Sequence, residues 1–268
     1  MQQAPIRPQR GLCAPSVAAG VAVWLAYTAV TVTIQFSAGI PYTEWFKTAA
    51  NAWRTGVMSL AAGSILLIAV VAATRWSHLW HDPVRLPTTP LMKLAMALCV
   101  GATGLRLAGV RWADVPLDLL AAIVVSGVLV GFAEETLFRG LFLRALREGG
   151  RSEAVAAIWT AVCFGLFHLP NLAMGTGLVG TLQVILAATS GVVLYLFRRQ
   201  TGALWPAMLM HGTWDIAAFL AGTHAQPWLS VPSLALQAVL LLLGLALLVG
   251  LYRSDRATVA LPAGTGQA

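Results

Sequence analysis

Long apolar stretches alternate along the chain with short segments that are polar or rich in Pro and Gly. A helix that crosses the hydrocarbon core of a bilayer needs about 20 mostly apolar residues, with a range of roughly 17–25. The pattern predicts eight such helices, at residues 17–38, 56–74, 91–108, 117–144, 154–169, 178–196, 203–221 and 234–252. Neither an internal repeat nor a soluble domain is visible between them. We therefore expect one integral membrane domain over residues 1–268, an all-α bundle of about eight transmembrane helices.

The composition of the chain supports this interpretation. The 268 residues are 58% hydrophobic and only 10% charged, and the mean hydropathy is +0.77. Soluble domains carry roughly 25% charged residues. Charges this sparse cannot cover a water-exposed surface, which excludes a soluble enzyme, a secreted disulfide scaffold and a disordered protein. Cys13, Cys99 and Cys163 are odd in number and far apart, so they favour neither disulfides nor a thiolate metal site.

The net charge of +7 comes from basic residues in short runs between apolar stretches, which does not favour a nucleic-acid partner. Cytoplasmic loops of membrane proteins carry an excess of Lys and Arg. If the N-terminus is inside, the basic residues divide unequally between the two sides. The cytoplasmic set is Arg7, Arg10, Arg75, Arg85, Lys93, Arg144, Arg147, Arg151, Arg198, Arg199, Arg253 and Arg256, and the outer set is Lys47, Arg54, Arg106 and Arg111. This asymmetry predicts a multi-pass protein of the cell membrane with both termini in the cytoplasm.

Several ionisable residues lie inside the predicted helices, where each costs ~2.5–3.5 kcal/mol on insertion scales and is a functional hypothesis by default. They are Glu134, Glu135 and Arg139 in the fourth helix, His168 in the fifth, and His211 and Asp215 in the seventh. At ~1.5 Å per residue, Glu134, the two histidines and Asp215 all lie roughly 12–21 Å below the cytoplasmic surface. One water-accessible cavity could therefore collect a carboxylate and two imidazoles from three helices.

Simpler interpretations exist for most of these residues. Glu135 and Arg139 are four residues apart and could neutralise each other. His168 could be a helix-end histidine at the headgroups, and His211 and Asp215 could satisfy each other. Glu134 is harder to explain structurally, because adjacent side chains point about 100° apart on a helix and Arg139 lies closer to Glu135.

Three motifs contain these residues: EETLFR at 134–139, FGLFH at 164–168 and HGTWD at 211–215. Together they resemble the EExxxR, FxxxH and HxxxN or HxxxD motifs of the CAAX protease and bacteriocin-processing family of intramembrane endopeptidases, which includes the type II CAAX prenyl endopeptidases. The order of the motifs and the count of about eight helices also match this family. The resemblance covers mainly residues 117–221, which would form the catalytic core.

The resemblance implies a role for each position. Glu134 would be the general base that activates the attacking water, together with His168. His211 and Asp215 would stabilise the tetrahedral oxyanion. Glu135 and Arg139 would be a supporting pair that fixes the helix around Glu134.

Asp215 departs from the Asn of the eukaryotic-type prenyl endopeptidases, because an ionised carboxylate cannot donate a hydrogen bond to an oxyanion. Three alternatives follow: Asp215 is protonated, it orients His211, or it serves a metal. Glu plus two His is a plausible zinc set, which would make the protein a metalloprotease, but the chain contains no HExxH. We favour metal-independent water activation and keep a divalent metal such as zinc as the alternative.

The function predicted from these residues is an intramembrane endopeptidase that hydrolyses a membrane-associated protein or peptide within the lipid bilayer. One alternative is a non-catalytic membrane module for binding or immunity. Another is a proton-coupled transporter, since buried Glu, His and Arg also build proton relays. Transporters often contain inverted repeats and paired broken helices, and the sequence shows neither.

Overall fold

A computed structural model describes residues 11–259 of the chain, and its regular structure there is helical apart from two isolated β-bridges. Arg7, Arg10 and the side chain of Arg256 lie outside this described part. The helices are α1 (Val17–Ser37), α2 (Ala49–Ala52), α3 (Met58–Thr74), α4 (Pro90–Ala108), α5 (Leu117–Glu135), α6 (Leu143–Glu148), α7 (Glu153–Leu166), α8 (Val179–Thr201), α9 (Trp205–His224) and α10 (Ser230–Val259). The all-α class predicted from the sequence is confirmed.

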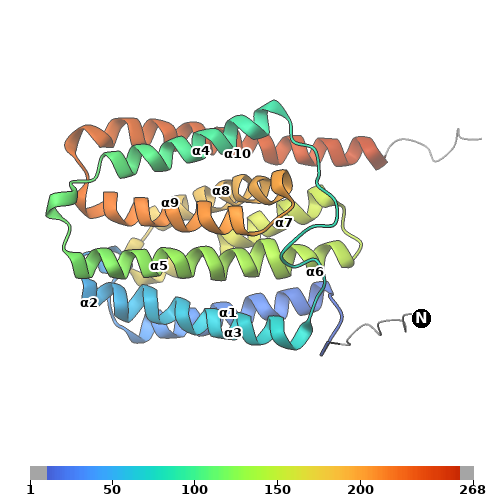
Figure 1. Ribbon diagram of the computed structural model, residues 1–268, viewed down its shortest axis with the longest axis horizontal. Helices are drawn as coiled ribbons and strands as arrows, with labels where there is room; N and C mark the ends of the chain where they lie inside the picture. The colour runs from blue at the N-terminus through green and yellow to red at the C-terminus, as the bar shows by residue number, and fades with distance from the viewer. Residues whose placement is uncertain (1–10, 260–268) are drawn as a thin grey trace, which may run out of the picture.

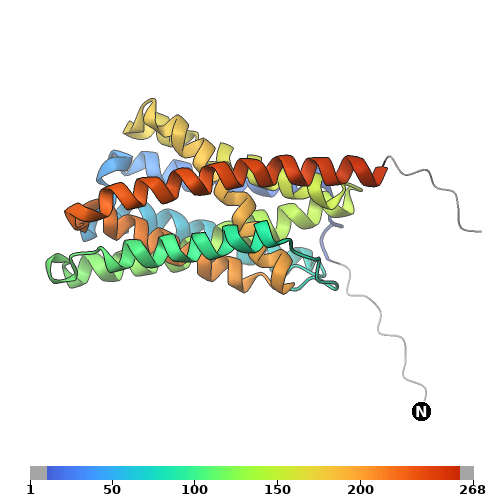
Figure 2. The ribbon, with the colours of Figure 1, turned by 90° about the horizontal axis from the view of Figure 1, so that it is seen from above.

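Two pairs of these helices are continuous in space. A π-helical turn at Trp53–Val57 joins α2 to α3, and a longer one at Thr136–Phe142 joins α5 to α6. Residues 11–259 therefore form eight rods, one for each predicted apolar segment. Most of these rods run along the long axis of the molecule, and α8 crosses it obliquely (Figures 1 and 2).

Within the described part of the chain, six of the rods, rather than eight, are long and apolar enough to cross a membrane. The exceptions are α7 and α9. Helix α7 has 14 residues, about 21 Å at 1.5 Å per residue, because it ends at Leu166 and a turn leads into Pro170. Helix α9 is long enough, but it carries His211, Asp215 and His224. Both helices pack among the others in the bundle (Figures 1 and 2).

The surface of the rods is apolar, as expected for a protein that faces lipid. Ile65, Val128 and Leu242 on three different spans are each more than 60% exposed. Soluble monomers rarely expose apolar side chains in such numbers along whole helices. With the six candidate spans, this surface describes a multi-pass membrane protein in a bilayer environment.

Helices α5 and α9 approach each other through glycine. A Cβ atom at Gly131 of α5 would lie 2.3 Å from the carbonyl oxygen of Met208, and one at Gly212 of α9 would lie 2.5 Å from that of Gly127. No side chain fits at either position, so the two backbones lie in contact. Small residues four apart, such as Gly127 and Gly131, are a common device for close helix packing in membranes. This approach places the end of α5 beside the start of α9.

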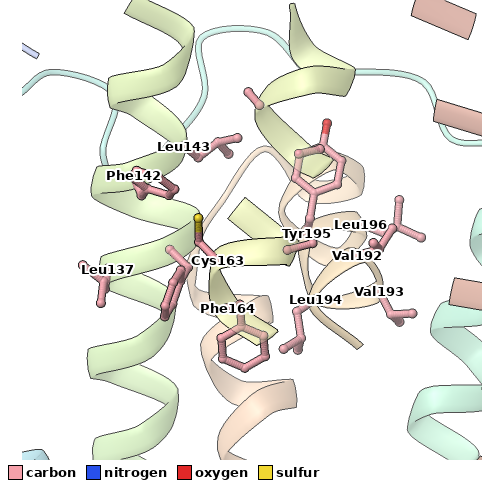
Figure 3. Close-up of a cluster of buried hydrophobic side chains, with 14 of the residues drawn as sticks. Leu137, Phe142, Leu143, Cys163, Phe164, Val192, Val193, Leu194, Tyr195 and Leu196 are labelled. Atoms are coloured by element: carbon pink, nitrogen blue, oxygen red, sulfur yellow. The ribbon is translucent and has the colours of Figure 1, made fainter. Parts of the chain in front are cut away.

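A hydrophobic core fills the space where the α5–α6 rod, α7 and α8 meet. Figure 3 shows side chains from all three, including Leu137, Phe164 and Tyr195, packed against one another. Leu137 and Tyr195 are fully buried, and Phe164 is 2% exposed. This core helps to fix the position of the short helix α7 in the bundle.

One end of the bundle contains a partly buried ionic cluster, which we call the end network; it comprises Asp82, Arg147, Glu153 and Arg198. Arg198 is fully buried, and its Nη2 and Nε donate to the two carboxylate oxygens of Asp82 at 2.6 and 3.1 Å. Arg147 donates to Asp82 at 2.8 Å and to both oxygens of Glu153 at 2.6 and 2.8 Å. Burial opposes ionisation of Asp82, but the hydrogen bonds and charges of Arg198 and Arg147 outweigh it and hold its pKa below the ordinary value.

Candidate active site

The two adjacent glutamates, Glu134 and Glu135, are the last residues of α5, directly before the π-helical turn at Thr136–Phe142. Both are buried, with 6% and 0% of their surface exposed. π-Helical turns are rare and occur often at functional sites, because the extra residue redirects the side chains that follow. Glu134 and Glu135 point in different directions, as the helical geometry requires, and their surroundings differ.

Glu135 is held by two hydrogen bonds to the same carboxylate oxygen. Its Oε1 accepts from Nη1 of Arg139 at 2.7 Å and from Nδ1 of His211 at 2.8 Å. Arg139 is fully buried; it donates from Nη2 to the carbonyl of Gly191 at 2.9 Å and lies 4.4 Å from the ring centre of Phe164. The ion pair between Glu135 and Arg139 predicted from their spacing is present, and it also links α5 to α8 and α9.

His211 has its two ring nitrogens in different environments. Because Nδ1 is bonded to Glu135, Nε2 faces Glu134 and Asp215, at 3.9 Å from Oε2 and 3.8 Å from Oδ2. Both distances exceed a hydrogen bond. The carboxylate that orients His211 is therefore Glu135 and not Asp215, although Asp215 lies four residues away on the same helix. A carboxylate on Nδ1 fixes the ring and leaves Nε2 to act in the site.

His168 follows the end of α7 and is fixed in the same way, by a backbone group. Its Nδ1 lies 2.9 Å from the carbonyl oxygen of Phe164, an acceptor, so Nδ1 carries the proton and Nε2 is available. The Phe164 ring packs edge to face against both His168 and His211, with ring centres 5.1 and 5.4 Å apart. The first residue of the FGLFH motif thus positions both imidazoles.

A cavity of about 380 Å³ brings the predicted catalytic residues together. Glu134, His168, His211 and Asp215, from three separate helical segments, all line it. Glu135 and Arg139 are fully buried beside the site and hold its residues in place. The prediction that one cavity could collect these groups agrees with this geometry.

Part of the cavity wall comes from helices that sequence reasoning had not connected with the site. Arg106 of α4 lines the cavity, donates to Gln237 of α10 at 2.7 Å and lies 4.1 Å from the ring centre of Trp214. Arg106 belongs to the outer set of basic residues predicted from the sequence. The structure places it within the span Pro90–Ala108, and an ionisable residue inside a predicted helix was the signal that could have found it.

Three further polar residues, Tyr42, Asn171 and Gln183, also line the cavity. They belong to the connector between α1 and α2, to the segment after His168 and to α8. None of them belongs to the three motifs, and no feature of the sequence places them near one another.

Glu134, His168 and His211 are the donor set that the sequence offers for zinc. Among residues 11–259, no three His, Cys, Asp or Glu side chains come together as metal ligands do. The arrangement in this structure therefore does not fit a zinc site.

Residues 116–217 match the family model described as "Type II CAAX prenyl endopeptidase Rce1-like". The matched segment spans the three motifs and runs from the residue before α5 into α9. No curated protein matches the chain. The family match confirms the resemblance that the motifs indicate and implies a hydrolase of the CAAX endopeptidase type, embedded in a membrane by the spans described above.

Proposed function

We propose that this protein is an intramembrane endopeptidase that hydrolyses a peptide bond of a membrane-associated protein or peptide with water activated by Glu134 and His168. The observation that carries the proposal is the shared cavity, which is lined by a carboxylate without an arginine partner and by two imidazoles whose Nδ1 atoms are already occupied. Each imidazole is held by its own scaffold contact, so the two Nε2 atoms are preorganised.

Glu134 is the general base in this proposal. Arg139 is bonded to Glu135, which leaves the Glu134 carboxylate free to accept a proton from water. His168 presents Nε2 to the same cavity and offers the water a second acceptor. The water oxygen attacks the carbonyl carbon, the C=O π electrons move to oxygen, and the water proton passes to Glu134. A positioned base of this kind contributes about 10²–10⁴ in rate.

His211 stabilises the oxyanion. To donate from Nε2 it must carry protons on both nitrogens, and the Glu135 carboxylate at Nδ1 favours this imidazolium form. Asp215 adds a second negative charge 3.8 Å from Nε2, which favours the same form. The tetrahedral intermediate then loses its amine: the C–N bond breaks, and the proton held by Glu134 moves to the leaving nitrogen.

Both termini are assigned to the cytoplasm. The described ends of the chain, at α1 and α10, lie at the same end of the bundle, as an even number of passes requires (Figure 1). The connectors at this end carry Arg75, Arg85 and Arg151, as the excess of basic residues on the cytoplasmic side requires.

Incubation of the purified protein in lipid nanodiscs with a library of membrane-associated peptides tests the function. We expect wild-type protein to cleave a subset of the peptides and Glu134→Gln to lose turnover by at least about 10²-fold, because Gln cannot accept the proton. Glu148→Gln is the matched control, since Glu148 is a half-exposed partner of Arg144 outside the cavity. A chelator should leave wild-type turnover unchanged.

The outcome that contradicts the proposal is substantial cleavage by Glu134→Gln, or no cleavage by folded wild-type protein. Loss of wild-type turnover on chelation, restored by zinc, would instead show that hydrolysis depends on a metal.

A further inference from the structure

The oxyanion requires hydrogen-bond donors, and Asp215 is a poor one when ionised. His211 supplies a single donor from Nε2. A second possible donor, the hydroxyl of Tyr42, lies in the wall of the same cavity. Tyr42 belongs to the short helical turn Tyr42–Glu44 between α1 and α2. This segment lies outside residues 116–217, which carry the three motifs.

A chain of two hydrogen bonds fixes the direction in which the Tyr42 hydroxyl can donate. Nδ2 of Asn171 donates to Oε1 of Gln183 at 3.1 Å. Gln183 must therefore present its Nε2 to the other side, where it donates to the Tyr42 oxygen at 2.8 Å. The phenol oxygen accepts in this bond, so its own hydrogen remains available to the cavity.

The position of the Tyr42 ring is also fixed. Its centre lies 4.7 Å from that of Trp45, whose indole nitrogen donates to the carbonyl of Ile40 at 3.0 Å. The charges of Asp215 and Glu134 reach the hydroxyl electrostatically. Burial, reinforced by these two charges against the opposing Gln183 hydrogen bond, raises the pKa of Tyr42 to about 12. The group is consequently a donor throughout the neutral range.

We propose that Tyr42 is a catalytic residue that donates a hydrogen bond to the scissile carbonyl oxygen as this atom becomes the tetrahedral oxyanion. The proposal rests on the endopeptidase function proposed above. Tyr42 keeps its proton throughout: the C=O π electrons move to oxygen, water supplies the new C–O bond, and Glu134 takes the water proton. Gln183 and Asn171 are positioning residues that aim the hydroxyl.

Kinetics of Tyr42→Phe test this role, because the substitution removes the hydroxyl and keeps the ring against Trp45. We expect kcat to fall about 10²-fold, the loss typical of one oxyanion donor, with KM changed by less than about twofold. Tyr195→Phe is the matched control: it also removes a hydrogen-bonded hydroxyl, which donates to Glu153 at 2.5 Å, but at the end network rather than in the cavity. It should keep the wild-type kcat.

Binding measurements separate catalysis from folding. A phosphinate peptide that mimics the tetrahedral intermediate should lose affinity for Tyr42→Phe, while the matching uncleaved peptide, measured in the Glu134→Gln background, should not. Equal losses for both ligands, or an unchanged kcat, would overturn the role of Tyr42 and leave the protease function intact. Absence of turnover in folded wild-type protein would overturn both proposals.

Discussion

Two buried ionic clusters lie within this bundle, and they differ in how their charges are satisfied. In the end network, the carboxylates of Asp82 and Glu153 each receive two or more guanidinium hydrogen bonds of 2.6–3.1 Å. In the cavity, Nε2 of His211 stands 3.8–3.9 Å from the carboxylates of Asp215 and Glu134, beside about 380 Å³ of open space. In this protein, charged groups that are incompletely paired lie beside the cavity and form the candidate site. Charged groups that are paired by short hydrogen bonds belong to the scaffold.

Neighbouring residues show the same contrast within a single helical turn. Glu135 bonds to Arg139 and His211 and is fully buried behind the cavity wall, whereas Glu134 lines the cavity. Their carboxylates are chemically identical, so the difference lies entirely in the surrounding partners.

The largest effect is expected from breaking the paired cluster. Asp82→Asn leaves Arg198 and Arg147 without their shared carboxylate, and removing one partner of a buried ion pair costs roughly 3–5 kcal/mol. We expect the free energy of unfolding in detergent to fall by about that amount, while turnover per folded molecule stays at the wild-type level. Asp114→Asn is the control, because Asp114 forms an exposed pair with Arg111. A stable Asp82→Asn without turnover would place the end network in the active site.

Widening the gap between α5 and α9 should affect stability and catalysis together. Gly131→Val places a side chain against the carbonyl of Met208, and overpacking of this kind typically costs about 1–3 kcal/mol. It also moves His211 away from Glu135, so we expect turnover per folded molecule to fall as well. Gly101→Ala is the control, because a Cβ at Gly101 meets no atom within 4 Å. Wild-type turnover in a destabilised Gly131→Val would show that the site does not depend on this packing.

Acid titration gives a smaller and more specific effect on the end network. A group whose pKa is lowered by folding contributes stability above its unfolded pKa and loses it as the pH falls through its folded value. Asp82 is such a group, with an ordinary value of 3.8. Between about pH 5 and pH 3, the melting temperature of the wild type should therefore fall more steeply than that of Asp82→Asn. Parallel pH profiles of the two proteins would contradict this assignment.

The smallest effect on stability is expected at Asp215. Its nearest ionic partner, Nε2 of His211, lies 3.8 Å away, so Asp215→Asn breaks no short ion pair and should change the unfolding free energy by less than about 1 kcal/mol. We also expect turnover to persist, because Glu135 still holds His211 and Asn donates at every pH. An inactive variant, together with chelator-sensitive wild type, would identify Asp215 as part of a metal site.

The fold was predictable from the sequence to the extent that the bilayer dictates it. Each apolar segment became one helical rod, because backbone groups in lipid must bond within the segment. The length of α7 was not predictable from hydropathy alone, because the predicted segment continues through Phe167 and Leu169 on either side of His168, whereas the helix ends at Leu166 and a turn leads into Pro170. The motif residues were predictable as a group, because ionisable side chains in apolar helices are rare.

The contacts that those residues make were harder to predict from the sequence. The hydrogen bond between Glu135 and His211 depends on the close approach of α5 and α9. The four-residue spacing of Gly127 and Gly131 indicates that α5 packs closely against another helix, but it does not indicate which one. Tyr42 reaches the cavity only through the folding of a connector, and no periodicity or spacing places a connector residue in a particular cavity.

The wall of the cavity is built from two parts of the chain. We expect one part to supply the groups for hydrolysis and the other to influence which substrates bind. Residues 116–217 supply the carboxylates and imidazoles, whereas Arg106 and Gln237 line the same space from helices outside that segment. On the function proposed above, we expect proteins that share the three motifs to differ in substrate through changes in the flanking helices. A chimaera that exchanges α4 and α10 between two such proteins should exchange their substrate preferences and keep one hydrolytic apparatus.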